Sequence, residues 1–299
     1  MSEAAAIVRP DVEVVNRKIT SSPPPDYHCT CRFCQNYQGE LIRKDGTNYS
    51  KFDRNAYYVK GEDSMESGHI AKTPLHIARW AVQAFTKEDD WVLDPTIGAG
   101  TTAVEALRLG RNVAGMEIQF IDIVKKNIAA NNPMNKLFRV RHGDARQVGD
   151  FLASLHGVFN GRLTLVVNNP PYSGDVRQQS MGGGGVKDAT YDPRFANLAF
   201  LKEGQEYWDT ITKIYSDCAD ALAPGGHFVV GVKDMMRKKK PYLLHERLAQ
   251  VLEAIGLQHV GNVVLRHYPT TMFINTYQKI HKDAPPPPLF QSIIVFKKP

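Results

Sequence analysis

Hydrophobic and polar positions follow two alternating periods from residue 73 onward. Short apolar runs rich in Val, Ile and Leu predict strands, and apolar residues three or four positions apart predict helices. Strands are predicted near 91–93, 112–116, 137–141, 163–167, 226–232, 261–265 and 292–296. Helices are predicted near 73–85, 101–109, 120–131, 145–155, 205–222 and 243–255. This alternation is typical of a doubly wound α/β fold with a mostly parallel, seven-stranded sheet.

The first 68 residues show no sustained helical or strand period. They are interpreted as an irregular N-terminal extension that holds three of the four cysteines, followed by one α/β domain over residues 69–299. Loops near 173–201 and 266–290, together with the basic stretch 233–240, are candidates for contact with a substrate. The basic stretch has an equally plain interpretation as a solvated surface.

Composition narrows the class of partner. The chain has 299 residues, 42% of them hydrophobic and 23% charged, which is typical of a globular protein. Its net charge of +6 and pI near 9.0 favour a polyanionic partner such as nucleic acid, although many basic enzymes bind none. Without an apolar run of 18 residues or a signal-like N-terminus, the sequence predicts a cytoplasmic protein that does not cross a membrane.

A glycine-bearing turn follows the first predicted strand, in the sequence DPTIGAGTT from Asp94 to Thr102. Gly98 and Gly100 allow the backbone to pass close to a ligand, although single glycines often serve only tight packing. Glu117 ends the next strand, where an acidic residue can accept hydrogen bonds from a ribose. The turn lacks the third glycine of G-x-G-x-x-G and no G-K-[ST] is present, which disfavours a nicotinamide dehydrogenase and a P-loop nucleotidase.

A second motif, Asn168-Asn169-Pro170-Pro171-Tyr172, directly follows the apolar strand LTLVV. The prolines fix the backbone, so that the Asn169 side chain and the Pro170 carbonyl can serve as rigid acceptors. The tyrosine offers a flat surface to a planar ring. The alternative is a strand-ending turn with a packed tyrosine, and the glycine-bearing turn upstream makes that alternative weaker.

These motifs resemble those of the S-adenosylmethionine-dependent amino-methyltransferases that methylate exocyclic nitrogens of DNA bases. The resemblance covers about residues 68–295 and rests on DPTIGAGTTAVEALRLGRNVAGMEI, VVNNPPY, GHIAKTP before the first helix, Gly143-Asp144-Ala145, and the segment 221–226. It implies a Rossmann-like class I methyltransferase fold with S-adenosylmethionine as the cofactor. No resident metal is implied.

The resemblance also assigns residues to roles. Asp94 and the following turn would hold the methionine moiety, Glu117 the ribose hydroxyls and Asp144 the adenine amino group. The cofactor-binding set is Lys72, Thr73, Asp94, Pro95, Thr96, Gly98, Gly100, Thr101, Thr102, Glu117, Ile118, Asp144, Ala145 and Asn169. The catalytic set is Asn169, Pro170, Pro171 and Tyr172, in which Asn169 and the Pro170 carbonyl accept hydrogens from the target amine and Tyr172 stacks on an extruded base.

The substrate implied by the resemblance is DNA, within a restriction-modification context, and Asn169 favours adenine N6 over cytosine N4. The short distance along the chain between the two motifs leaves no room for a recognition domain there. Methylation of guanine N2 or adenine N6 in RNA, or of protein glutamine, stays open as an alternative. A non-catalytic binding subunit with a relic pocket is a third interpretation, and the oligomeric state is left open.

A cluster of His28, Cys29, Cys31 and Cys34 has the spacing of half a zinc site. A closed zinc site needs four ligands in suitable geometry, and the adjacent histidine is awkward for that purpose. Reduced, unliganded cysteines are therefore the preferred interpretation.

Overall fold

The computed structural model describes residues 12–15, 32–33, 37–43, 73, 75–172, 198–202, 204–237, 240–266 and 290–299. A nine-stranded sheet forms their centre, with the strand order β1-β2-β10-β11-β7-β6-β3-β4-β5. Its strands are β1 (Val12–Val15), β2 (Tyr37–Arg43), β3 (Trp91–Asp94), β4 (Asn112–Glu117), β5 (Phe138–His142), β6 (Leu163–Asn168), β7 (His227–Lys233), β10 (Gln258–Arg266) and β11 (Phe290–Lys297).

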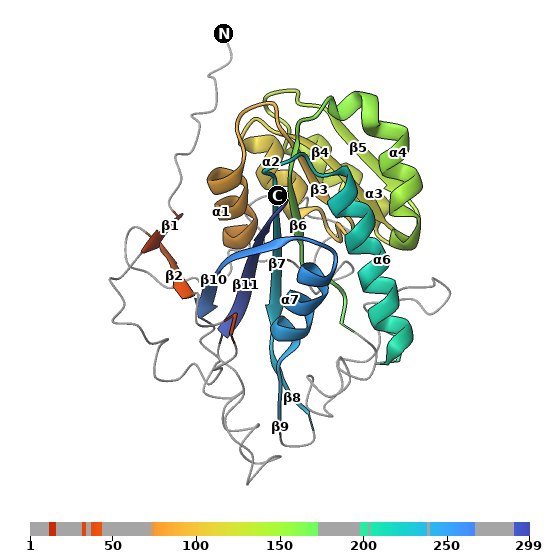
Figure 1. Cartoon of the computed structure of the whole chain (residues 1–299). Coiled ribbons are helices and arrows are strands. Elements are labelled where there is room, and N and C mark those ends of the chain that lie inside the picture. Colours follow the sequence, from red (N-terminus) through yellow and green to blue (C-terminus); the bar gives the residue numbers. More distant parts are fainter. Residues whose placement is uncertain are drawn as a thin grey trace.

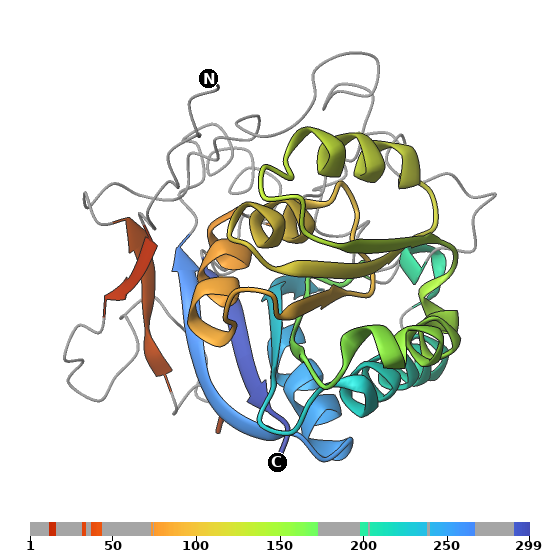
Figure 2. The same cartoon turned by 90° about the horizontal axis from the view of Figure 1, so that it is seen from above.

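Helices cover both faces of this sheet (Figures 1 and 2). One face carries α1 (Leu75–Phe85), α2 (Thr101–Arg108) and α3 (Ile121–Ala130), and the other carries α4 (Val148–Phe159), α6 (Gln205–Ala221) and α7 (Leu244–Ala254). Short 3-10 helices occupy Ala145–Gln147 and Leu198–Phe200. The buried apolar side chains accordingly form two clusters, one on each side of the sheet. The doubly wound α/β prediction is confirmed.

The six predicted helices and seven predicted strands are all present, with ends that differ by a few residues. Strands β3 to β7 pair in parallel, whereas β11 runs antiparallel to both β7 and β10. Two further strands, β1 and β2, come from the segment that the sequence predicts to be irregular. They extend one edge of the sheet by backbone pairing, since β2 pairs with β10. Such pairing does not require the apolar alternation that a sequence reveals.

The carboxyl ends of parallel strands β3, β4, β5, β6 and β7 meet at one edge of the sheet. A small hairpin of β8 (Met235–Arg237) and β9 (Lys240–Tyr242) continues from the carboxyl end of β7 (Figure 1). Both sequence motifs therefore fall at this edge, where doubly wound sheets bind ligands.

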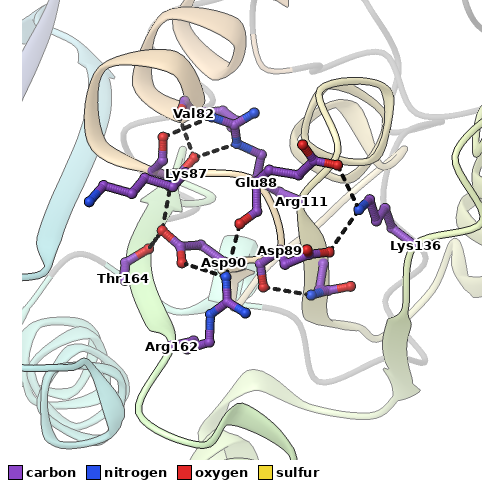
Figure 3. A network of polar contacts seen from close by, with 11 residues as sticks. Val82, Lys87, Glu88, Asp89, Asp90, Arg111, Lys136, Arg162 and Thr164 are labelled. Carbon is purple, nitrogen blue, oxygen red and sulfur yellow. Dashed lines mark hydrogen bonds and ion pairs between the residues drawn. The ribbon is translucent and has the colours of Figure 1, made fainter.

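The opposite edge, at the amino ends of the strands, is joined by a polar network (Figure 3). Asp90 lies immediately before β3 and is 8% exposed. Its carboxylate accepts hydrogen bonds from the Lys87 backbone N–H at 2.8 Å and the Thr164 hydroxyl at 3.1 Å, and it pairs with Arg162. Lys136 bridges the carboxylates of Glu88 and Asp89 at 3.0 and 2.7 Å. This network ties loops together on the side away from the motifs.

Within the described part of the chain, none of the helices has both the length and the apolar character to cross a bilayer.

Candidate active site

Asp94 ends β3 and is only 2% exposed. Its carboxylate accepts a hydrogen bond from the Thr102 hydroxyl at 2.7 Å and one from the Thr96 backbone N–H at 3.2 Å. Burial raises the pKa of Asp94 to about 6, against the opposing effect of these hydrogen bonds, and the nearby Glu117 raises it further. The site therefore holds a carboxylate that a positive charge would stabilise.

Asn168, the last residue of β6, joins the two motifs. Its side-chain Nδ2 donates to Asp94 Oδ1 at 3.2 Å and to Thr96 Oγ1 at 2.8 Å. Its Oδ1 accepts from the Tyr215 hydroxyl of α6 at 2.9 Å. Asn168 is 1% exposed, and these three bonds fix both ends of its amide. The sequence analysis placed Asn168 in the second motif but gave it no role.

The turn after β3 is built around two glycines in the left-handed region. Gly98 has φ +57° and Gly100 has φ +87°, values that side chains disfavour. Gly100 caps α2, which begins at Thr101, and the cap has no side-chain hydrogen bond. The Gly98 backbone N–H donates to Glu117 Oε2 at 2.9 Å, so that the turns after β3 and β4 are held together.

Glu117 accepts further hydrogen bonds from the backbone N–H groups of Gln119 at 2.8 Å and Phe120 at 3.0 Å. Burial raises its pKa, and the backbone donors counteract that shift. Glu117 is thus a fixed carboxylate at the end of β4, with Ile118 half-buried beside it. This is the position in which a ribose-binding acid was predicted.

Gly115 is a site-shaping residue that the sequence analysis missed. A Cβ at this position of β4 would lie 2.7 Å from Ile97 Cδ1 and 2.9 Å from the Asp94 backbone oxygen. Because the backbone oxygen cannot move aside easily, only glycine lets the turn after β3 lie against β4. A glycine within a predicted strand was the signal for such a close approach.

Asp144 follows β5 and begins the 3-10 helix that contains the buried Ala145. Its carboxylate accepts from the Arg146 backbone N–H at 2.9 Å and forms an ion pair with the Arg146 guanidinium. This pairing raises the pKa of Arg146. The Gly143 backbone N–H donates to the Glu117 carbonyl at 3.0 Å, which brings Asp144 to the same edge as Glu117.

Asn169 is half-buried at the start of the second turn, directly after Asn168. Its Oδ1 accepts a hydrogen bond from Gln291 Nε2 of β11 at 3.0 Å. An amide oxygen has two lone pairs, so this bond leaves acceptor capacity for a second donor. The rigid acceptor predicted from the sequence thus has a partner on another strand, which the sequence analysis did not foresee.

The remainder of the second motif is held from two sides. The Pro171 carbonyl accepts from the Tyr207 hydroxyl of α6 at 2.9 Å. The Tyr172 hydroxyl accepts from the Lys233 backbone N–H at 2.9 Å, at the end of β7, and the ring packs against the apolar cluster of that face. Burial raises the pKa of Tyr172 to about 12, so that the hydroxyl stays neutral near pH 7.

The structure therefore brings the predicted residues from Asp94 to Thr102, Glu117, Ile118, Asp144, Ala145 and 169–172 to one edge of the sheet. Thr73 lies half-buried just before α1, while Lys72, His28 and the cysteines Cys29, Cys31 and Cys34 lie outside the described residues. Most of the predicted substrate loops 173–201 and 266–290 also lie outside them. Among the residues that are described, no group of three or more His, Cys, Asp or Glu side chains could hold a metal ion.

Known proteins match only part of the chain. Residues 29–126 match a family model described as DNA methylase. Type II methyltransferase M2.DpnII of Streptococcus pneumoniae is 39% identical over 79 residues, 26% of this chain and 30% of that protein. The tRNA (guanine(10)-N2)-dimethyltransferase of Methanocaldococcus jannaschii is 30% identical over 105 residues, 34% of this chain and 27% of that protein. The chain thus spans less than a third of these curated relatives' length.

A solved structure of a TehB-like SAM-dependent methyltransferase from Corynebacterium glutamicum has 15% sequence identity and a TM-score of 0.39, covering 75% of this chain and 88% of that chain. The sheet and its carboxyl-edge turns define a Rossmann-like methyltransferase domain. Residues 29–126 belong to the DNA methylase family, which confirms the resemblance over this stretch. This match begins upstream of residue 69, and the predicted domain boundary stays a prediction.

S-adenosylmethionine is the cofactor that goes with this family, and the site fits it. Asp94 and Glu117 are two buried carboxylates at neighbouring strand ends, and each has a raised pKa. A cationic ligand would relieve the cost of holding both charges in one buried region. A sulfonium and an ammonium group together provide that charge.

Proposed function

We propose that this protein transfers a methyl group from S-adenosylmethionine to an exocyclic amine of a DNA base, with adenine N6 as the preferred target. The observation that carries the proposal is the pairing of the two motifs through Asn168, which donates to Asp94 and Thr96. The residue that follows, Asn169, is the predicted acceptor for the amine. The match of residues 29–126 to a DNA methylase model supports DNA as the substrate.

In this proposal the cofactor supplies an activated methyl group, and the protein orients the amine. An exocyclic amine is a poor nucleophile because its lone pair is delocalised into the ring. Asn169 Oδ1 and the Pro170 carbonyl accept its two hydrogens, which favours a more tetrahedral nitrogen with its lone pair directed at the methyl group. Tyr172 supports the ring of the base. A duplex base has to leave its stack to reach these groups.

The test uses purified protein, labelled S-adenosylmethionine and separate pools of unmethylated DNA, tRNA, rRNA and protein. We expect label in DNA alone, and mass spectrometry of the hydrolysed product to yield N6-methyladenine. Label that enters RNA alone, or protein alone, overturns the choice of substrate. N4-methylcytosine as the product overturns the choice of base and keeps the choice of polymer.

The first variant to compare is Asn169→Ala. It removes the acceptor next to the reacting nitrogen, so we expect methyl transfer to be abolished. Calorimetry should find cofactor binding weakened only modestly, because the groups that surround Asp94 stay in place. Asp94→Ala should give the reverse pattern, with cofactor binding strongly weakened. If the two variants exchange these patterns, the assigned roles are wrong.

A second candidate is an RNA methyltransferase that acts on guanine N2. The similarity to the tRNA (guanine(10)-N2)-dimethyltransferase of Methanocaldococcus jannaschii favours this alternative, since it extends over 34% of this chain. The same two acceptors would orient that amine. The tRNA pool of the labelling experiment decides between the two candidates.

A further inference from the structure

Gln291 lies near the start of β11, where it pairs with Lys233 of β7. Its side chain crosses β7 to reach Asn169, and the donated hydrogen bond between Gln291 Nε2 and Asn169 Oδ1 measures 3.0 Å. Gln291 is 4% exposed, so its amide has little contact with solvent. A buried amide is destabilising unless it is paired, and Asn169 supplies a partner.

Gly231 makes this contact possible. It lies on β7 between the two amides, and a Cβ there would stand 3.0 Å from Asn169 Oδ1 and 3.2 Å from Gln291 Nε2. Both distances are shorter than ordinary van der Waals contact, so a side chain at residue 231 would push the amides apart. The absence of a side chain thus serves the contact between β6 and β11, and the reason is space.

The orientation of the Asn169 amide matters for the proposed chemistry. Rotation about the last side-chain bond of asparagine has two broad minima that exchange the positions of oxygen and nitrogen. Only the oxygen accepts a hydrogen from a target amine, because the amide nitrogen is itself a donor. A donor fixed on β11 favours the rotamer in which Oδ1 meets it and disfavours the flipped one.

We infer that Gln291 is a positioning residue that orients the Asn169 amide for methyl transfer, across the gap left by Gly231. This inference rests on the proposed function. Gln291 acts through Asn169, and the second lone pair of the Asn169 oxygen receives the amine. The substitution of either Gln291 or Gly231 should therefore lower the rate of transfer and spare the binding of the cofactor.

The test compares Gln291→Met, which keeps the length of the side chain and removes the donor, with the wild-type protein. We expect kcat to fall by roughly three- to tenfold, the rate equivalent of one net hydrogen bond, with the cofactor Kd unchanged. Asn262→Leu is the matched control, because Asn262 is a buried amide of β10 that is 1% exposed and contacts His259 at 3.0 Å. It should lower stability and keep the kcat.

Gln291→Glu gives a readout that a loss of packing cannot imitate. Its carboxyl donates to Asn169 Oδ1 when protonated and repels that oxygen when ionised. Its activity relative to the wild-type protein should therefore fall as the pH rises, while the activity of Gln291→Met relative to the wild-type protein stays constant with pH.

Two results overturn the inference alone: wild-type kcat in Gln291→Met, or parallel pH profiles for the two Gln291 variants. Gly231→Ala provides a second route to the same loss if Gln291→Met does not fold. A wild-type protein without methyl transfer to any of the four pools overturns the proposed function, and the inference with it, which is a distinct result.

Discussion

At the scale of single residues, Asp94 combines deep burial with a role that requires charge. Its pKa of about 6 in the folded protein means that the carboxylate is neutral in mildly acidic solution. A cationic cofactor binds the ionised form more tightly, because the charge of the ligand stabilises the carboxylate. Binding must therefore lower the pKa of Asp94, and cofactor affinity must depend on pH.

We predict that cofactor affinity rises as the pH increases up to about 6 and then levels off. Below that value, each pH unit should weaken binding by up to about tenfold, until the pKa of the bound form is reached. Calorimetry between pH 5 and pH 8 measures this dependence. Asp94→Asn is the control, since its affinity should be lower and should not change over the same range. A flat profile in the wild-type protein would refute the assignment.

Asn168 leads to a second prediction at this scale. Asn168→Leu removes the donor shared by Asp94 and Thr96 and leaves the Tyr215 hydroxyl without its acceptor. We expect the cofactor Kd to rise about tenfold, as the loss of a hydrogen bond to a charged group implies. Titration calorimetry measures the change. An unchanged Kd would mean that Asn168 only fills space, and Asn262→Leu controls for the loss of a buried amide.

Sequence patterns located the residues of the site but could not reveal their partners. Asp94, Glu117 and Asn169 were predicted because each follows an apolar strand, and strand ends of a parallel sheet converge. Gln291 and Tyr215 were missed, since each acts by a contact set by strand or helix packing. Gln291 is 122 positions from Asn169 along the chain, and no local period encodes that contact.

At the scale of elements, apolar periodicity sufficed for strands and helices that bury a full face. It failed for β1 and β2, whose place is set by backbone pairing with each other and with β10. Helices α1 and α2, by contrast, are joined by a feature invisible in the pattern. Arg79 of α1 forms an ion pair with Glu105 of α2 at 2.8 Å, and the two residues are 9% and 1% exposed.

This buried pair provides the prediction for the elements. Glu105→Leu leaves the guanidinium of Arg79 buried without its carboxylate, and we expect a loss of about 3–5 kcal/mol in the free energy of unfolding. The exposed pair of Lys213 and Asp217 on α6 is the matched comparison, and Lys213→Ala should cost less than about 1 kcal/mol. Urea denaturation of both variants measures the difference. Equal losses would refute the distinction.

At the scale of the whole molecule, charge and geometry point to the same edge of the sheet. The chain carries a net charge of +6, and the sequence from 233 to 240 has five basic residues. That stretch runs from the end of β7 into the β8–β9 hairpin, and the Lys233 backbone N–H donates to the Tyr172 hydroxyl. A polyanion that reaches the catalytic motif would therefore pass close to this basic segment (Figure 1).

A polyanionic substrate makes the reaction sensitive to salt in a way that separates it from cofactor binding. Each phosphate that the protein neutralises releases condensed counterions, and added salt opposes that release. We predict that the KM for DNA rises by roughly tenfold or more between about 50 and 200 mM salt, as a few phosphate contacts imply. The cofactor Kd should change much less, because its partners Asp94 and Glu117 are buried and poorly screened. Steady-state kinetics at fixed saturating cofactor measures the first quantity and calorimetry the second. Replacement of Lys238 and Lys239 by alanine should reduce the slope of log KM against log salt by about two if both contact phosphates, and an unchanged slope would remove the hairpin from the DNA-binding surface.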